Sequence, residues 1–136
     1  MLSPTVDTIR LFLHILAASV WVGGQIVLAG IVPALHRSYP EATKLAARAY
    51  ARIAWPAFAV VVVTGLWNLA EIDVSNTTTT YQITLFVKVT LAIVSGAAAA
   101  VHQVGDSRAA KAVGGALGLV GALGAMFVGY LLTTGS

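Results

Sequence analysis

The sequence has no cysteine and very little charge. Without cysteine, disulfides, iron–sulfur clusters and thiolate metal sites are excluded. Only 10% of the 136 residues are charged, whereas about a quarter are charged in an average globular domain. Lysine and arginine form no basic run, so the sequence predicts no nucleic-acid partner. The length suits a single domain, residues 1–136.

Four long apolar runs take up most of the chain, approximately at Ile9–Val32, Ala46–Leu69, Tyr81–His102 and Ala112–Leu132. About 20 apolar residues in a helix span the hydrocarbon layer of a membrane. Backbone groups in lipid need internal partners, so such runs must be helical. The first run is too long for the apolar core of a signal peptide. We therefore predict an all-α membrane protein, a four-helix transmembrane bundle that is multi-pass in the cell (inner) membrane.

The breaks between the runs predict the orientation of the chain. We expect loops at His36–Pro40, Asp73–Thr80 and Gly105–Arg108. Cations mark the cytoplasmic side, and they gather at the first and third breaks: Arg37, Lys44, Arg48, Arg52, Arg108 and Lys111. The second break has acidic residues and no cation. Both termini are therefore predicted on the outer side.

Polar residues inside the runs form two stripes. Lys88, Ser95 and His102 are seven residues apart and share one face of the third helix. His14, Trp21 and Gln25 share a face of the first helix in the same way. We expect each stripe to face the bundle interior, where ionisable groups in membranes are normally found. The alternatives are that Lys88 reaches to the outer interface and that the histidines are hydrogen-bonded packing residues.

Glycines recur on the fourth helix, at Gly114, Gly115, Gly118, Gly121 and Gly124. Small residues let two helix backbones approach closely in a membrane. Tight packing within the bundle explains the stripe most simply. A homo-oligomer through Gly114, Gly118 and Gly121 is one alternative, and a flat surface against a planar cofactor is another.

The residue types favour haem over other metal sites. Three histidines far apart do not make a structural zinc site, and two methionines without cysteine make a poor copper(I) carrier. Haem needs one neutral histidine and an apolar wall. We expect His14 to be the axial ligand and Trp21 to be part of the wall. The trans ligand stays open between Lys88 and Met126, which match His14 in depth, while His102 is more than ten residues deeper.

Short motifs along the first three helices resemble a known family. They are His14 with Trp21-Val22-Gly23-Gly24, Arg52-Ile53-Ala54-Trp55-Pro56 with Thr64-Gly65-Leu66, and Lys88 with His102 fourteen residues later. In this order they are similar to the copper resistance protein D (CopD) superfamily, and especially to its HemJ-type protoporphyrinogen oxidases. One position departs from the HemJ-type pattern, because Pro33 is followed by Ala34 where that pattern has Pro-Arg.

The resemblance implies a four-helix fold that binds haem b, with His14, Lys88 and His102 at the family's histidine and lysine positions. It further implies a haem-dependent oxidoreductase in electron transfer or porphyrin oxidation, with a quinone or another membrane redox partner. Two alternatives stay open. One is a CopD-type copper transport or resistance protein, and the other is an accessory subunit of a membrane complex.

Overall fold

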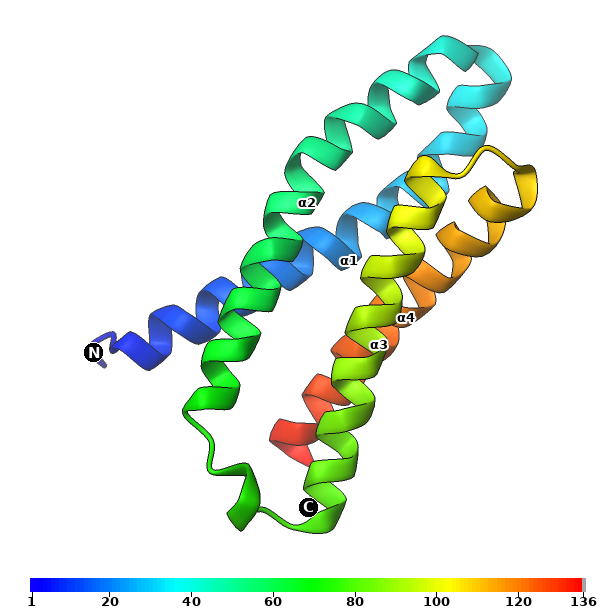
Figure 1. Cartoon of the computed structure of the whole chain (residues 1–136). Coiled ribbons are helices and arrows are strands. Elements are labelled where there is room, and N and C mark those ends of the chain that lie inside the picture. Colours follow the sequence, from blue (N-terminus) through cyan, green and yellow to red (C-terminus); the bar gives the residue numbers. More distant parts are fainter. Residues whose placement is uncertain (136) are drawn as a thin grey trace. The chain divides into compact units, whose positions relative to one another are not determined.

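The computed structural model describes residues 1–135, and these residues form helices and no strand. The helices are α1 (Val6–Ser38), α2 (Pro40–Ala70), α3 (Thr79–Val104) and α4 (Arg108–Thr134), with a short 3-10 helix η1 (Val74–Asn76) before α3 (Figure 1). All four α-helices are long and apolar enough to cross a membrane. The predicted fold class is confirmed: the chain is an all-α membrane protein with four membrane-spanning helices.

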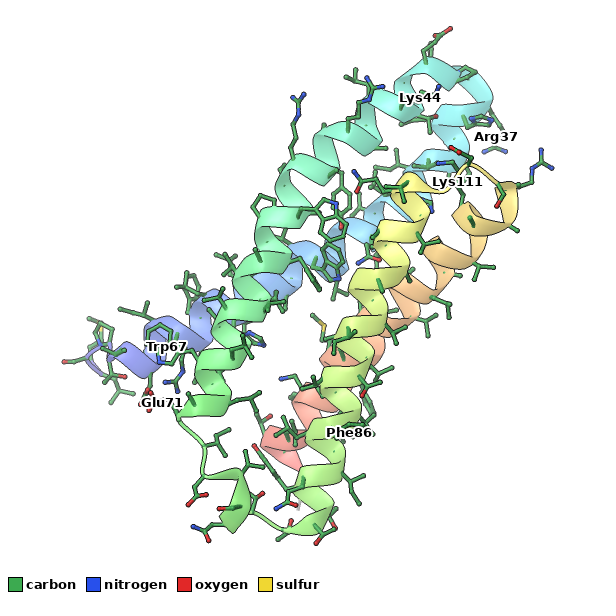
Figure 2. All side chains as sticks on the ribbon, in the orientation of Figure 1. Arg37, Lys44, Trp67, Glu71, Phe86 and Lys111 are labelled. Atoms are coloured by element: carbon green, nitrogen blue, oxygen red, sulfur yellow. The ribbon has the colours of Figure 1, made fainter. Side chains whose placement is uncertain are left out.

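The four helices form two compact units, each of them a helical hairpin. The first unit, Met1–Asp73, pairs α1 with α2, and the second begins at Val74 and pairs α3 with α4. Large apolar side chains such as Phe12, Phe86 and Phe127 are more than half exposed. Figure 2 shows Phe86 pointing outward from α3. Side chains of this kind suit contact with lipid, which is as apolar as they are.

The helices extend beyond the predicted apolar runs at their ends. Thr5 begins α1 with a capping box that it forms with Thr8. Ser107 caps α4 in a similar way, because its side chain accepts a hydrogen bond from the amide of Ala110. The predicted first loop, His36–Pro40, is wrong except at Tyr39. α1 continues through Ser38, and Pro40 is the first residue of α2, where a missing N–H breaks no helical hydrogen bond.

Close contact between backbone and side chain defines the α1–α2 hairpin. A Cβ atom added at Gly24 of α1 would overlap the ring of Tyr50 on α2. The Tyr50 hydroxyl donates a hydrogen bond to the carbonyl oxygen of Trp21, at 3.1 Å. The small residues Ala17 and Ala54 are buried in the same hairpin. Glycine at position 24 therefore makes room for an aromatic ring between the two helices.

The α3–α4 hairpin is closed by the glycine stripe. Gly114, Gly118 and Gly121 are buried on α4. A Cβ atom at Gly114 would lie 2.7 Å from the carbonyl oxygen of Ala98, and one at Gly121 would lie 3.0 Å from that of Leu91. The Ser95 hydroxyl donates to the Gly118 carbonyl oxygen at 2.7 Å. The glycines of α4 thus pack tightly against α3, which is the simplest interpretation of the stripe.

Candidate functional site

His14 is held in place by a hydroxyl group of the neighbouring helix. Its Nδ1 atom lies 2.8 Å from Oγ1 of Thr64, which is buried on α2. Gly65 lies beside this pair, where a Cβ atom would make an ordinary van der Waals contact with Cε1 of His14, at 3.5 Å. The predicted stripe of His14 and Trp21 therefore faces α2, inside the first hairpin.

The hydrogen bonds of Thr64 decide which nitrogen of His14 carries a proton. The Thr64 hydroxyl lies 2.6 Å from the carbonyl oxygen of Val60 and 3.3 Å from that of Val61. Carbonyl oxygens only accept, so the single hydroxyl proton of Thr64 is used there. Thr64 must then accept from His14, and Nδ1 of the neutral ring is the protonated nitrogen. The lone pair of the imidazole is consequently on Nε2, the atom that binds metals when Nδ1 is hydrogen-bonded.

An aromatic cluster lies two turns further along α1. The ring of Trp21 is 5.3 Å from that of Trp55 and 4.5 Å from that of Phe58, measured between centroids. The Trp55 and Phe58 rings meet edge to face at 5.9 Å. Trp21 is only 5% exposed, so its ring is a rigid part of the hairpin interior. The cluster provides an apolar wall on the same face of α1 as His14.

Another apolar surface adjoins Thr64. A groove of about 330 Å³ runs between α1 and α2 and is lined by Leu13, Ala59, Val60, Val63, Thr64 and Trp67. Its lining exposes no polar atom. The histidine–threonine pair is thus bordered by apolar side chains within its own hairpin.

A charged cluster at the open end of the first hairpin was missed by the sequence analysis. Arg10 is 8% exposed, and its Nε donates to Oδ1 of Asn68 at 2.6 Å. Its Nη1 lies 2.9 Å from Asp7 and 4.0 Å from Glu71. The guanidinium also lies 5.6 Å from the ring of Trp67, and Figure 2 shows Trp67 and Glu71 at this end of α2. The cluster ties the start of α1 to the end of α2.

The spacing of residues contained a signal for this cluster. Arg10 precedes His14 by four residues, and Asn68 follows Thr64 by four. Residues four apart share a helix face, so once His14 faces Thr64 across an antiparallel pair, Arg10 must face Asn68. The spacing predicts the contact between Arg10 and Asn68 only when the pairing of the two helix faces is known.

Lys88 lies on α3 against a glycine of α4. A Cβ atom at Gly129 would lie 3.2 Å from Cε and 3.4 Å from Nζ of Lys88. The lysine is half-buried. It forms no ion pair or hydrogen bond with any residue from 1 to 135. Its amine therefore lies along the hairpin surface where α4 has no side chain.

His102 is exposed near the connection of the second hairpin. Its Nδ1 lies 2.6 Å from the carbonyl oxygen of Lys111, to which it must donate. A Cβ atom at Gly115 would lie 3.1 Å from the same nitrogen, so glycine there makes room for the ring. The predicted common face of Lys88, Ser95 and His102 is confirmed, since all three contact α4. At about 1.5 Å per residue, the fourteen residues from Lys88 to His102 span roughly 21 Å.

The predicted site residues are divided between the two hairpins. His14 and Trp21 belong to the first, and Lys88, His102 and Met126 belong to the second, where Met126 is 43% exposed on α4. Each hairpin thus holds one imidazole whose Nδ1 is hydrogen-bonded. Over the described part of the chain, no group of three or more histidine, cysteine, aspartate or glutamate side chains could hold a metal ion.

Comparison of the chain with family models, with curated proteins and with solved structures found no match.

Proposed function

We propose that this protein binds haem b in the cell (inner) membrane and acts in electron transfer or porphyrin oxidation of the HemJ type. The observation that carries the proposal is the hydrogen bond between His14 and Thr64. It fixes the tautomer in which Nε2 holds the lone pair, and a fixed tautomer is the usual state of a histidine that binds a metal. The bound haem would supply one-electron redox chemistry.

The first hairpin fits the requirements of haem in two further respects. Trp21, Trp55 and Phe58 form an apolar wall on the His14 face of α1, and the groove beside Thr64 exposes only apolar atoms. A neutral imidazole places no charge in lipid, unlike a carboxylate ligand. His14 would hold the iron, Thr64 would orient the ring, and the aromatic residues would exclude water.

A second residue would hold the haem together with His14. Lys88 and Met126 are the candidates, and either would require the two hairpins to assemble as a four-helix bundle. His102 has a different place in the proposal. Its Nδ1 is engaged by Lys111 close to the hairpin connection, so we assign it to packing there, with an influence on activity and not on ligation. A quinone or another membrane redox partner would exchange electrons with the haem.

The test is the absorption spectrum of the protein purified in detergent. We expect a Soret band and about one haem per chain by the pyridine haemochrome assay. His14→Ala should abolish the band, and added imidazole should restore part of it. His36→Ala, in the exposed last turn of α1, is the matched control and should bind haem fully. Full occupancy with an unshifted spectrum in His14→Ala would refute the proposal.

The same preparation separates the alternatives. A colourless protein that binds copper would support the CopD-type transport function instead. A preparation that holds neither haem nor copper would support the accessory-subunit alternative.

A further inference from the structure

Three cations form a stripe along the first half of α2. Lys44, Arg48 and Arg52 are four residues apart, and all three are exposed. With 3.6 residues per turn, a spacing of four turns the side chain by only about 40° at each step. The three charges therefore lie on one face of α2, one above the other. We call these three residues the α2 stripe.

The stripe has no counter-ion within residues 1–135. None of the three cations forms an ion pair with a residue of this range, and the ion pairs of Arg10 lie at the other end of the hairpin. Glu41 lies one turn before Lys44 but forms no ion pair with it. Like charges four residues apart on a helix repel one another, so an anionic partner from outside the chain would stabilise this face.

The length of α2 places the stripe at the membrane surface. The helix has 31 residues and ends at Ala70, so at about 1.5 Å per residue it is roughly 46 Å long. About 20 residues fill the hydrocarbon layer, and counting these back from Ala70 reaches Ala51. Arg52 thus lies at the edge of the hydrocarbon, and Arg48 and Lys44 follow at steps of about 6 Å through the headgroup layer.

The surface around the stripe is hollowed. A depression of about 430 Å³ is lined by Pro40, Glu41, Lys44, Leu45 and Arg48. Leu45 is 71% exposed beside the two cations. In Figure 2 Lys44 lies at the turn between α1 and α2, far from Trp67 and Glu71. Basic and apolar side chains together suit an amphiphile that is anionic at its head.

We propose that the α2 stripe binds the headgroup phosphate of an anionic phospholipid. The partner is a lipid and not a soluble acidic protein, because the stripe begins where the hydrocarbon ends and a lipid phosphate is at that depth. Cations in this layer attract anionic lipids by about 1 kcal/mol each, which is roughly a fivefold change in affinity. The proposal does not depend on haem.

The experiment uses the full chain reconstituted in mixed vesicles of phosphatidylglycerol and phosphatidylcholine. Electron spin resonance of tail-labelled lipids gives the relative association of the two lipids with the protein. We expect preference for phosphatidylglycerol in the wild type and about a fivefold loss of that preference in Arg48→Ala. Added salt should weaken the preference.

Two control variants distinguish the stripe from net charge alone. Arg48→Ala combined with Ala49→Arg keeps the charge and moves it about 100° around the helix, onto another exposed position. This variant should lose the preference as Arg48→Ala does. Arg37→Gln with Arg108→Gln removes two cations outside the stripe. This variant should retain most of the preference for phosphatidylglycerol.

Three results would overturn the proposal. The first is equal association of both lipids with the wild type, and the second is an unchanged preference in the variant with the moved charge. The third is displacement of phosphatidylglycerol by inorganic phosphate more effectively than by chloride at the same ionic strength, which would indicate a site for free anions.

Discussion

At the scale of single residues, Thr64 has more influence than its size suggests. Its hydroxyl accepts a hydrogen bond from His14 and donates one to the carbonyl oxygen of Val60. Valine has the shape of threonine without the hydroxyl, so Thr64→Val would leave the packing and remove the group that orients the imidazole. The ring could then adopt either tautomer.

We therefore expect Thr64→Val to weaken haem binding by about 10- to 100-fold, the usual cost of removing such a partner. Thr64→Ser keeps the hydroxyl and should bind nearly as well as the wild type. Titration of haem into the apoprotein measures both affinities. Equal affinity for Thr64→Val and wild type would mean that the hydrogen bond serves packing only.

Asn68 is the second residue with an outsized role, because it accepts the hydrogen bond of a buried arginine. Asn68→Leu would leave Nε of Arg10 without its partner at a position that is 8% exposed. Losing a hydrogen bond to a charged group costs about 1.5–3 kcal/mol. We expect the free energy of unfolding in mixed micelles to fall by about this amount.

Gln25→Leu provides the comparison for Asn68→Leu. Gln25 donates only to a carbonyl oxygen of its own helix, that of Trp21, which also accepts from Tyr50. Its loss should cost well under 1 kcal/mol, as is usual when a hydrogen bond is removed without leaving a buried group unpaired. A loss for Asn68→Leu as small as that expected for Gln25→Leu would show that the hydrogen bond to Arg10 adds no stability.

The sequence alone predicted part of this residue-scale picture. The faces of His14 and Trp21, and of Lys88, Ser95 and His102, follow from helical periodicity. The pairing of Arg10 with Asn68 does not, because the two residues are 58 positions apart and only the register between α1 and α2 brings them together.

At the scale of elements, glycines on different helices have opposite roles. A Cβ atom at Gly114 would lie 2.7 Å from backbone atoms of both Ala98 and His102, whereas one at Gly30 of α1 would meet nothing within 4 Å. Backbone atoms cannot move aside as a flexible side chain can. The same substitution should therefore change stability in opposite directions at the two positions.

Gly114→Ala should destabilise the protein by about 1–3 kcal/mol, the typical cost of overpacking. Gly30→Ala should stabilise it by about 0.5–1 kcal/mol, because alanine is the better helix former. Unfolding in mixed micelles gives both values. Equal stability of the two variants would mean that α4 does not need glycine for its contact with α3.

The helices themselves were predictable because each needs about 20 apolar residues to span the membrane. Their ends were not, since an apolar run stops where water begins but a helix need not stop there. α1 continues through His36 and Arg37, and α2 already includes the polar residues from Pro40 to Lys44. Basic residues in the last turn of α1 also favour its continuation, because they interact well with the helix dipole.

At the scale of the whole molecule, the distribution of cations predicts the orientation in the membrane. We expect both termini and the segment from Glu71 to Thr78 outside, and the connections at Tyr39 and at Gly105–Ser107 in the cytoplasm. The chain has no cysteine, so single cysteines can be introduced without competing thiols. In intact cells an impermeant maleimide should label Thr77→Cys and not Ser107→Cys. The reverse pattern would invert the topology.

The hydrogen bond from Arg10 to Asn68 has a consequence for the synthesis of the protein. Arg10 is synthesised 58 residues before Asn68, so it precedes its partners Asn68 and Glu71 by most of α1 and α2. Until then the guanidinium has only Asp7, one turn away on the same helix. The hydrogen bond to Asn68 and the contact with Glu71 form only when α2 has been synthesised. Formation of the Arg10 cluster therefore depends on the second helix, and α1 alone satisfies only part of it.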